Sequence, residues 1–295
     1  MPHWFLTGAG HIGTLAAYYL TRAGHDVSVL RNEAGAAIDA TLQFASDAST
    51  RRLTLPVRTP STCDRPIEYL IVACKTPYTP AALTRLDLGP NATVLRLQNG
   101  IGSLDGLLPD GARLIETVTT NAVNGTRNVH RVVAENQTWM GDGNTKPAWF
   151  DELARCWPGL VWERDIRTAQ WRKLVANAAI NALTALHDVP NGALLDDAQL
   201  YAQMRAIVAE TDQVLAALDE DWKASSLAAV ETVVQATAAN TSSMRADMQH
   251  GAVTEIDAIN GWLVEQGTRL GLDMTVNRTL VERVRALAPT RGSGE

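Results

Sequence analysis

The sequence predicts an N-terminal α/β domain built on a parallel sheet, followed by an all-α domain. Ten of the 12 prolines and 14 of the 21 glycines lie before residue 167, whereas the remaining 129 residues hold 24 alanines. Alanine is the best helix former and proline the worst, so the second part should be nearly all helix. The first part alternates short apolar runs with turn residues and helical patterns, as βαβ units do. We therefore expect domains at residues 1–166 and 167–295.

The predicted strands are short apolar runs bounded by turn residues. A helix over Thr14–Ala23 should follow the first strand and end at Gly24. After about residue 120, two closely spaced runs, Val129–Ala134 and Gln137–Met140, look antiparallel, and Pro289–Glu295 should form a loose tail. The runs expected to form the parallel sheet are Trp4–Thr7, Val27–Leu30, Tyr69–Ala73, Val94–Leu97 and Leu114–Val118.

Composition and charge exclude several classes of protein. A hydrophobic content of 46% is too high for a disordered chain, and the net charge of −6 gives no reason to expect nucleic acid or an anionic membrane as partner. The three cysteines form no CxxC pair and the six histidines show no ligand spacing, so neither disulfides nor a metal site is expected. With no signal peptide and no long apolar run, we expect a soluble cytoplasmic protein.

A glycine turn after the first strand carries the first functional motif. It matches G-x-G-x-x-G and lies between a strand and a helix, which is the context in which this motif binds a dinucleotide. The glycines permit a tight turn, close approach of the pyrophosphate and close helix–strand packing, with the phosphates at the helix N-terminus. A purely structural turn is the alternative. The predicted cofactor contacts are Gly8, Ala9, Gly10, His11, Ile12 and Gly13.

The residue after the second strand predicts which dinucleotide binds. NAD-binding folds usually place Asp or Glu there to accept from the ribose 2′-hydroxyl. This chain has Arg31 followed by Asn32, with no acid before Glu33. A guanidinium suits a 2′-phosphate, so the sequence favours NADPH over NADH, although a solvated surface arginine is the alternative.

A stripe of polar residues opens the second domain. Lys173, Asn177 and Asn181 are spaced by four, so they share one face of a helix that is otherwise almost entirely apolar. An apolar helix is usually buried, and unpaired burial of a polar group costs about 1–3 kcal/mol. These side chains should therefore meet a polar ligand, and a buried lysine can act as a proton donor near neutral pH. A solvent-facing stripe is the alternative.

Six motifs in order resemble one family, the ketopantoate reductases (2-dehydropantoate 2-reductases). The resemblance covers nearly the whole chain, from residue 5 to about residue 285. It implies a Rossmann-type NADPH-binding domain and a helical domain like the C-terminal domain of 6-phosphogluconate dehydrogenase. The motifs are the glycine turn with Arg31, Cys74-Lys75-Thr76, Gln98-Asn99-Gly100, Trp171-Arg172-Lys173 with Asn177 and Asn181, Thr241–Met244, and Asp247 with Thr254–Asp257.

The resemblance also implies an activity and a set of site residues. The activity is reduction of 2-dehydropantoate to pantoate, a step of pantothenate biosynthesis. Lys173 resembles the family's general acid, and Glu255 is expected close to it and to the cofactor. Lys75, Asn99 and Ala122 resemble further cofactor contacts. The substrate-binding positions would be Asn99, Asn177, Asn181, Asn191 and Ser243.

Each assignment has a structural alternative. Asn99 and Asn191 each stand before a glycine and suit plain turns, and Lys75 could only solvate a strand end. Glu255 could complement a helix N-terminus, and Ser243 could belong to a helix cap. We expect a small-molecule 2-keto acid as the partner, and a homodimer is one of the two assemblies found in the family.

Two departures from the family pattern stand out. His11 occupies a position of the glycine turn that is often small, and the segment Met274-Thr275-Val276-Asn277 lacks a proline that often precedes the asparagine. Neither change affects the proposed chemistry. The alternatives to a ketopantoate reductase are a paralogous reductase of another 2-keto acid and a non-catalytic NADP-binding sensor.

Overall fold

The computed structural model describes residues 2–287, and the chain divides into two compact units. The first comprises Met1–Gln98 and Leu104–Ala169, and the second comprises Asn99–Ser103 and Gln170–Glu295. The short segment Asn99–Ser103 therefore belongs to the helical unit although both of its flanks belong to the first. The tail predicted at Pro289–Glu295 lies outside the described residues.

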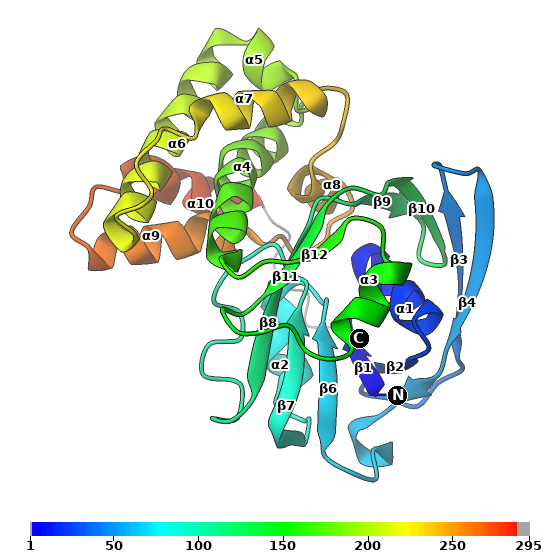
Figure 1. Cartoon of the computed structure of the whole chain (residues 1–295). Coiled ribbons are helices and arrows are strands. Elements are labelled where there is room, and N and C mark those ends of the chain that lie inside the picture. Colours follow the sequence, from blue (N-terminus) through cyan, green and yellow to red (C-terminus); the bar gives the residue numbers. More distant parts are fainter. Residues whose placement is uncertain (1, 288–295) are drawn as a thin grey trace. The chain divides into compact units, whose positions relative to one another are not determined.

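An eight-stranded sheet forms the centre of the first unit (Figure 1), with the order β12-β11-β8-β7-β6-β1-β2-β5. All five predicted parallel strands lie in it, and each pairs in parallel with its neighbours from β8 to β5. β11 runs antiparallel to β8 at one side. The strands are β1 (His3–Thr7), β2 (Asp26–Leu30), β5 (Val57–Arg58), β6 (Ile67–Val72), β7 (Leu88–Arg96), β8 (Arg113–Thr119), β11 (Thr138–Gly141) and β12 (Leu160–Trp162).

Helices cover this sheet because its strands are apolar on both faces. On one face, the fully buried Trp4 of β1 packs against Trp149, with ring centroids 5.1 Å apart. The opposite face packs a second apolar cluster that includes Leu70 and Leu83. The helices of the first unit are α1 (His11–Arg22), η1 (Pro60–Thr62), η2 (Thr76–Tyr78), α2 (Thr79–Leu83) and α3 (Phe150–Cys156).

A second sheet, which the sequence analysis did not predict, packs against α1 (Figure 1). Its strand order is β4-β3-β10-β9, and Phe44 of β3 lies 5.3 Å from Tyr18 of α1 between ring centroids. The runs predicted to be antiparallel lie in different sheets: β10 pairs antiparallel with β9, and β11 with β8. The four strands are β3 (Ile38–Phe44), β4 (Ser49–Leu55), β9 (Ala122–Gly125) and β10 (Val129–Ala134).

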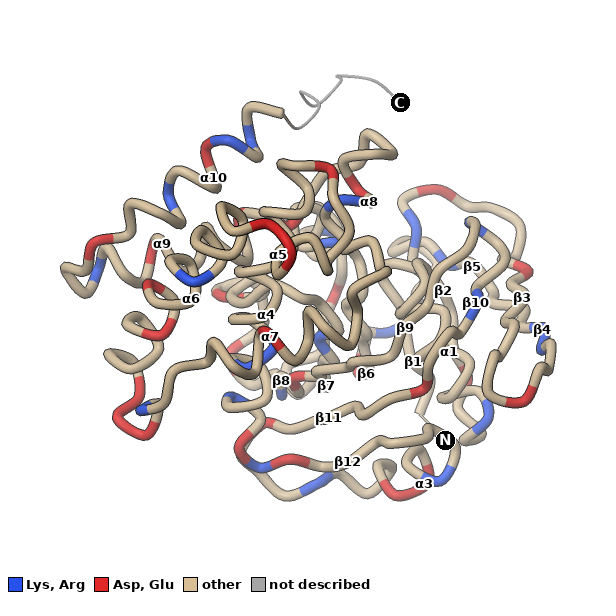
Figure 2. Tube along the Cα trace, turned by 90° about the horizontal axis from the view of Figure 1, so that it is seen from above, with Lys and Arg blue, Asp and Glu red and all other residues tan. Residues whose placement is uncertain are grey.

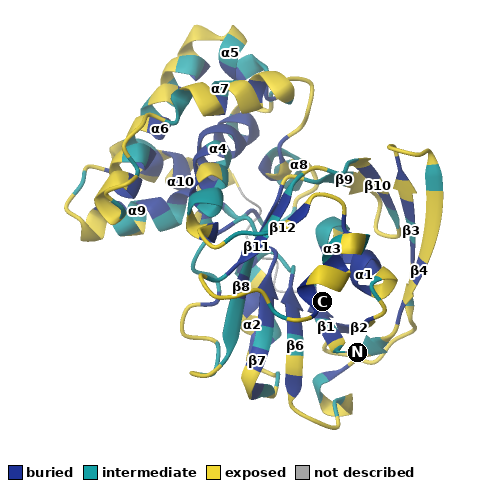
Figure 3. Ribbon diagram, viewed as in Figure 1, coloured by how far each residue is buried: buried dark blue, intermediate teal, exposed yellow. Residues whose placement is uncertain are grey.

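The second unit consists of helices, as its alanine content predicted. α4 (Ile166–His187) forms its centre and is buried over most of its length (Figure 3), because small alanines let neighbouring helices approach closely. The surrounding helices are α5 (Ala193–Asp196), α6 (Ala198–Leu218), α7 (Leu227–Ala236), α8 (Ser243–Gln249), η3 (Ile256–Ala258), α9 (Asn260–Arg269) and α10 (Thr275–Leu287).

A buried chain of hydrogen bonds joins α4, α6, α9 and α10. Asn260 donates to the carbonyl of Ala178 at 3.1 Å and to Asn277 at 3.0 Å, and Asn277 donates to Glu210 at 2.8 Å. Glu210 also accepts from the backbone N–H of Val276 at 2.7 Å. A proline at position 276 has no N–H to donate, so the departure noted at this position adds a hydrogen bond at the start of α10.

Charged residues of both signs are interspersed along α10 and the β3–β4 hairpin (Figure 2). Because the two signs are mixed, an anionic ligand would have to be bound by a local arrangement of cationic side chains and backbone N–H groups.

No helix among the described residues combines the length and the apolar character that a membrane span requires.

Candidate functional site

The predicted site residues of the first unit follow the carboxyl ends of parallel strands. Gly8 comes directly after β1, Arg31 directly after β2, and Lys75 shortly after β6. Ala122 follows β8 and begins β9. In open α/β sheets ligands bind outside the carboxyl ends of the strands, so the topology brings these positions to the edge where a ligand is expected.

The glycine turn has the geometry that close backbone approach requires. Gly8 has φ +92°, and a Cβ there would lie 2.2 Å from the backbone N of Cys74. A Cβ on Gly13 would lie 2.1 Å from the carbonyl oxygen of Gly8, whereas a Cβ on Gly10 would meet no atom within 4 Å. The first and third glycines thus allow close packing within the protein. The second leaves open space at the N-terminus of α1, which fits the approach of a pyrophosphate.

Among the residues that the structure describes, no side chain caps the N-terminus of α1, and the first turn of this helix contains no acidic residue. The helix dipole and N–H groups there are suited to an anion. His11 is the first residue of the helix, and its Nδ1 lies 2.9 Å from Nδ1 of His130 on β10. Ala9 and Ile12 are partly buried and pack against the core of the unit.

A cavity of about 920 Å³ opens beside the glycine turn. Gly8, Leu30 and Arg31 line it, together with Asn32 and Tyr78, which the sequence analysis did not assign to a site. The sequence could have indicated both residues, because each follows the carboxyl end of a parallel strand: Asn32 comes shortly after β2 and Tyr78 after β6. The exposed Arg31 donates its backbone N–H to Arg58 at 2.9 Å, which fixes the backbone at the carboxyl end of β2.

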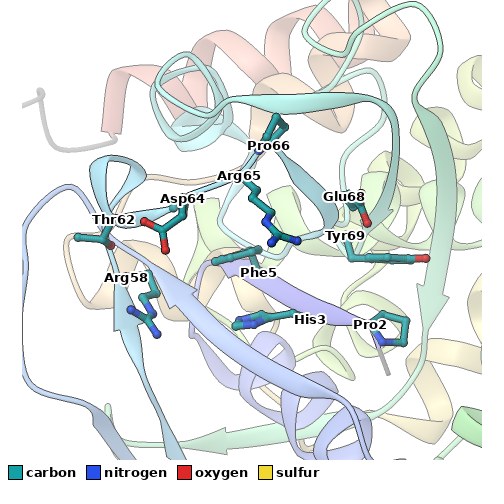
Figure 4. A pocket seen from close by; sticks show the side chains of 11 residues that line it. Pro2, His3, Phe5, Arg58, Thr62, Asp64, Arg65, Pro66, Glu68 and Tyr69 are labelled. Carbon is teal, nitrogen blue, oxygen red and sulfur yellow. The ribbon is translucent and has the colours of Figure 1, made fainter.

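A second hollow, of about 560 Å³, lies at the amino ends of β1 and β6 (Figure 4). His3 and Phe5 stack in it with ring centroids 4.6 Å apart, and Arg58 and Arg65 also line it. None of the residues that line it belongs to the glycine turn. This hollow therefore does not belong to the expected nucleotide site.

Polar contacts hold the ends of β6 and β7 together. The side chain of Gln98 donates to the carbonyl of Cys74 at 2.6 Å and to Oγ1 of Thr79 at 2.7 Å. Lys75 is partly buried and stands directly before η2. Ala122 is partly buried at the start of β9.

In the second unit, Lys173, Glu255 and Asn99 form one cluster. The Asn99 amide donates to the Glu255 carboxylate at 3.5 Å, and the backbone N–H of Ile101 donates to the carbonyl of Ala258 at 3.0 Å. Burial lowers the pKa of the Lys173 ammonium to about 8, against the opposing effect of the nearby Glu255 carboxylate. The side chain of Glu255 does not cap η3, which disfavours the helix-capping alternative.

The two asparagines of the polar stripe continue from Lys173 along α4. The Nδ2 atom of Asn177 is buried and makes no hydrogen bond among the described residues. Asn181 is 7% exposed, one helical turn further on. A buried amide without a partner costs about 1–3 kcal/mol, which a ligand acceptor would recover.

Ser243 and Asn191 are placed by the helices around the end of α4. Ser242, not Ser243, caps α8, and its Oγ lies 2.7 Å from Oγ1 of the buried Thr184 on α4. Ser243 is therefore exposed beside the far end of the polar stripe. Asn191 is buried and donates to Oγ1 of Thr237 at 3.0 Å, which gives it a structural contact, although its Oδ1 is buried without a partner among the described residues.

The predicted site residues thus form two groups, one in each compact unit. The described residues contain no group of three or more His, Cys, Asp or Glu side chains that could hold a metal ion. The first group offers backbone N–H groups and cations suited to a dinucleotide. The second offers an ammonium, a carboxylate and amides, which suit a polar substrate that receives a proton.

Comparison with protein families gives a match over nearly the whole chain. The family described as "Ketopantoate reductase PanE/ApbA" matches residues 4–145, and its C-terminal counterpart matches residues 165–288. A 2-dehydropantoate 2-reductase from Vibrio cholerae is 32% identical over 95% of this chain and 96% of its own length. One from Archaeoglobus fulgidus is 33% identical over 96% of both chains.

Solved structures share the fold. A PanE/ApbA family ketopantoate reductase from Ralstonia eutropha has a TM-score of 0.83 at 24% identity, covering 97% of this chain and 98% of its own. A dimeric ketopantoate reductase from Staphylococcus aureus has a TM-score of 0.83 at 20% identity, with the same coverage. A D-mandelate dehydrogenase in a ternary complex with NADH and anilino(oxo)acetate has a TM-score of 0.80 at 20% identity, again with the same coverage.

Proposed function

Because this chain belongs to the ketopantoate reductase PanE/ApbA family, we propose that it reduces 2-dehydropantoate to pantoate with NADPH as the hydride donor. The observation that carries the proposal is the cluster of Lys173, Glu255 and Asn99 on the same helical unit as Asn177, whose buried Nδ2 has no hydrogen-bond partner among the described residues. A non-catalytic sensor of NADP would have no use for a lysine whose pKa is lowered beside a carboxylate.

Lys173 supplies the proton in this reaction. The reduced nicotinamide, when bound, supplies a hydride to the C2 carbonyl carbon of the keto acid. Negative charge then grows on the carbonyl oxygen, and an ammonium within hydrogen-bond reach stabilises that charge and donates its proton. A pKa of about 8 keeps Lys173 largely protonated at neutral pH while making it a better acid than an exposed lysine.

Glu255 and the amides orient the other reacting groups. The Glu255 carboxylate favours the charged form of Lys173 and accepts from the amide of Asn99, so that it holds both side chains. We assign Asn177 and Asn181 to the polar groups of the substrate, with Ser243 at the end of the stripe. Asn191 is the substrate assignment with the least support, because Thr237 already accepts from its amide.

The first unit supplies the cofactor contacts. We assign the pyrophosphate to the glycine turn and the 2′-phosphate to Arg31, with Lys75, Asn99 and Ala122 as further contacts and Glu255 close by. The fold alone does not set the cofactor, since the D-mandelate dehydrogenase with this fold binds NADH. The preference for NADPH rests on Arg31 standing where an NAD-binding fold would have an acid.

Replacing Arg31 with alanine should therefore weaken NADPH far more than NADH. Loss of a charge-assisted hydrogen bond to a phosphate corresponds to roughly a 10–100-fold rise in the Kd for NADPH. The Kd values are to be measured by fluorescence titration of both cofactors. Arg51→Ala, which removes an exposed arginine of β4, is the control and should change neither. An equal loss for NADPH and NADH would show that Arg31 does not bind the 2′-phosphate.

The pH dependence of reduction should report the protonated state of Lys173. Since the general acid must carry its proton, kcat/KM for the keto acid should fall as pH rises through about 8. Glu255 raises the pKa of Lys173, so Glu255→Gln should move this inflection to lower pH. Asp257→Asn is a matched control, because Asp257 is exposed and paired with Arg285. An inflection that stays in place in Glu255→Gln would contradict the role of Glu255.

A panel of 2-keto acids tests the proposed substrate. NADPH oxidation should be fastest, by kcat/KM, with 2-dehydropantoate, and slower with simpler 2-keto acids and with NADH in parallel assays. A clear preference for another 2-keto acid would identify a paralogous reductase instead.

We also propose that the chain forms a homodimer, because a solved ketopantoate reductase with the same fold is dimeric. Light scattering would measure the molar mass that tests this. A biosynthetic reductase of this kind draws on the cytoplasmic NADPH pool, so we place the activity there.

A further inference from the structure

Two histidines meet at the N-terminus of the helix that follows the glycine turn. Nδ1 of His11 lies 2.9 Å from Nδ1 of His130, and the two rings are nearly perpendicular, with centroids 5.1 Å apart. A nitrogen–nitrogen contact of this length requires one proton between the two atoms, so one ring donates and the other accepts. His130 is 1% exposed and lies between Leu42 and Gly125 on the neighbouring strands, so its ring has little freedom to turn away.

Both rings are neutral near pH 7 in the absence of an anion. Burial lowers the pKa of His11. Burial is also the main cause that lowers the pKa of His130 to about 4, and the nearby His11 lowers it further. No other charged group is a cause of either shift. The titratable and charged groups of the surrounding elements are Tyr18, Tyr19 and Arg22 on α1, Arg131 on β10, Glu135 just after β10 and Asp39 on β3, while β9 carries none.

We infer that the His11–His130 pair takes up one proton from solvent when a dinucleotide pyrophosphate binds at the glycine turn. The proton resides on His11, whose Nδ1–H then donates to the neutral Nδ1 of His130. The Nε2–H of His11 then donates to the pyrophosphate. His130 stays neutral, because a second positive charge 2.9 Å away would be strongly repelled. The inference rests on the proposed binding of the cofactor at this turn.

The geometry favours this arrangement over a passive histidine. His11 begins α1, and the first turn of this helix contains no acidic side chain to balance an imidazolium, so an anion bound there would supply the opposite charge. His130 contributes a buried acceptor at the correct distance, which removes the need for water at Nδ1. The pair has a lower pKa in the free protein than in the complex with the dinucleotide. As pH rises from the first pKa to the second, the Kd for the dinucleotide should rise by about tenfold per pH unit.

Isothermal titration calorimetry of the full-length protein tests the inference. NADPH and NADH are titrated at pH 7 in two buffers whose ionisation enthalpies differ, and the difference in observed enthalpy gives the protons taken up. NADH is included because it lacks the 2′-phosphate, a group that itself titrates near pH 6. We expect uptake of about 0.5–1 proton per site with NADH for the unaltered protein.

Variants assign the proton to the pair. His11→Asn, at a partly exposed position, should abolish the uptake of a proton with NADH. His130→Leu, which removes the acceptor from a buried site, should reduce it, and its circular dichroism spectrum checks that it folds. His3→Asn, at the other end of β1, is the control and should leave the uptake unchanged.

Two outcomes would overturn the inference: an enthalpy of NADH binding that is independent of buffer, or an unchanged proton uptake in His11→Asn. Absence of binding heat in both buffers with both cofactors, confirmed by fluorescence titration, would instead overturn the proposed cofactor binding. The two failures are therefore distinguishable.

Discussion

Lys173→Met should lower kcat/KM for the keto acid by roughly 10²–10⁴-fold, the contribution that a positioned general acid usually makes. Methionine keeps a side chain of similar length but has no proton to donate. Because burial already disfavours the charged lysine, an uncharged side chain at this position of α4 should not unfold the helical unit. The expected loss is therefore in turnover and not in folding.

Steady-state kinetics and cofactor titration together measure this effect. The Kd for NADPH should stay within about twofold of the unaltered protein, because the assigned phosphate contacts lie in the other compact unit. Lys146→Met is the control, since Lys146 is exposed and pairs with the exposed Asp151. Turnover close to that of the unaltered protein in Lys173→Met would exclude Lys173 as the proton donor.

Gly8→Ala should lower the free energy of unfolding by about 2–4 kcal/mol, through positive-φ strain and overlap with the backbone. Gly8 has φ +92°, and the new Cβ would lie 2.2 Å from the backbone N of Cys74. No flexible side chain is available to move aside, so β1 and β6 would have to separate. Urea unfolding followed by tryptophan fluorescence measures the change.

Gly10→Ala is the matched comparison within the same turn. Its Cβ would meet nothing within 4 Å, so stability should change by less than about 1 kcal/mol. The same Cβ would occupy the open space assigned to the pyrophosphate, and the Kd for NADPH should rise. Equal destabilisation by Gly8→Ala and Gly10→Ala would contradict the roles given to the two glycines.

Local patterns account for the elements that the sequence predicted correctly. The five parallel strands are short apolar runs between turn residues, and α1 follows a glycine turn with a defined chemistry. In α4 the spacing of four between Lys173, Asn177 and Asn181 carries directly into one helical face. Each of these signals lies within a few residues of the feature that it predicts.

The second sheet was missed in part because a local signal was overlooked: Ile38–Phe44 alternates apolar and polar residues and pairs antiparallel with the nearby Ser49–Leu55 in the β3–β4 hairpin. The pairing of β3 with β10, which builds the hairpin into a sheet, joins distant parts of the chain and has no local signal. The clustering of Asn99–Ser103 with the helical unit has the same origin, since its partner Ala258 belongs to η3. The contact of His11 with His130 likewise depends on the unpredicted second sheet.

The proposed function requires transfer of a hydride from NADPH to the C2 carbonyl carbon of 2-dehydropantoate. The direct measurement uses NADPH that carries deuterium at the transferred position of the nicotinamide, with mass spectrometry of the product. We expect pantoate with one deuterium at C2, formed by the unaltered protein and formed much more slowly by Lys173→Met. Absence of pantoate, or pantoate without deuterium at C2, would contradict it.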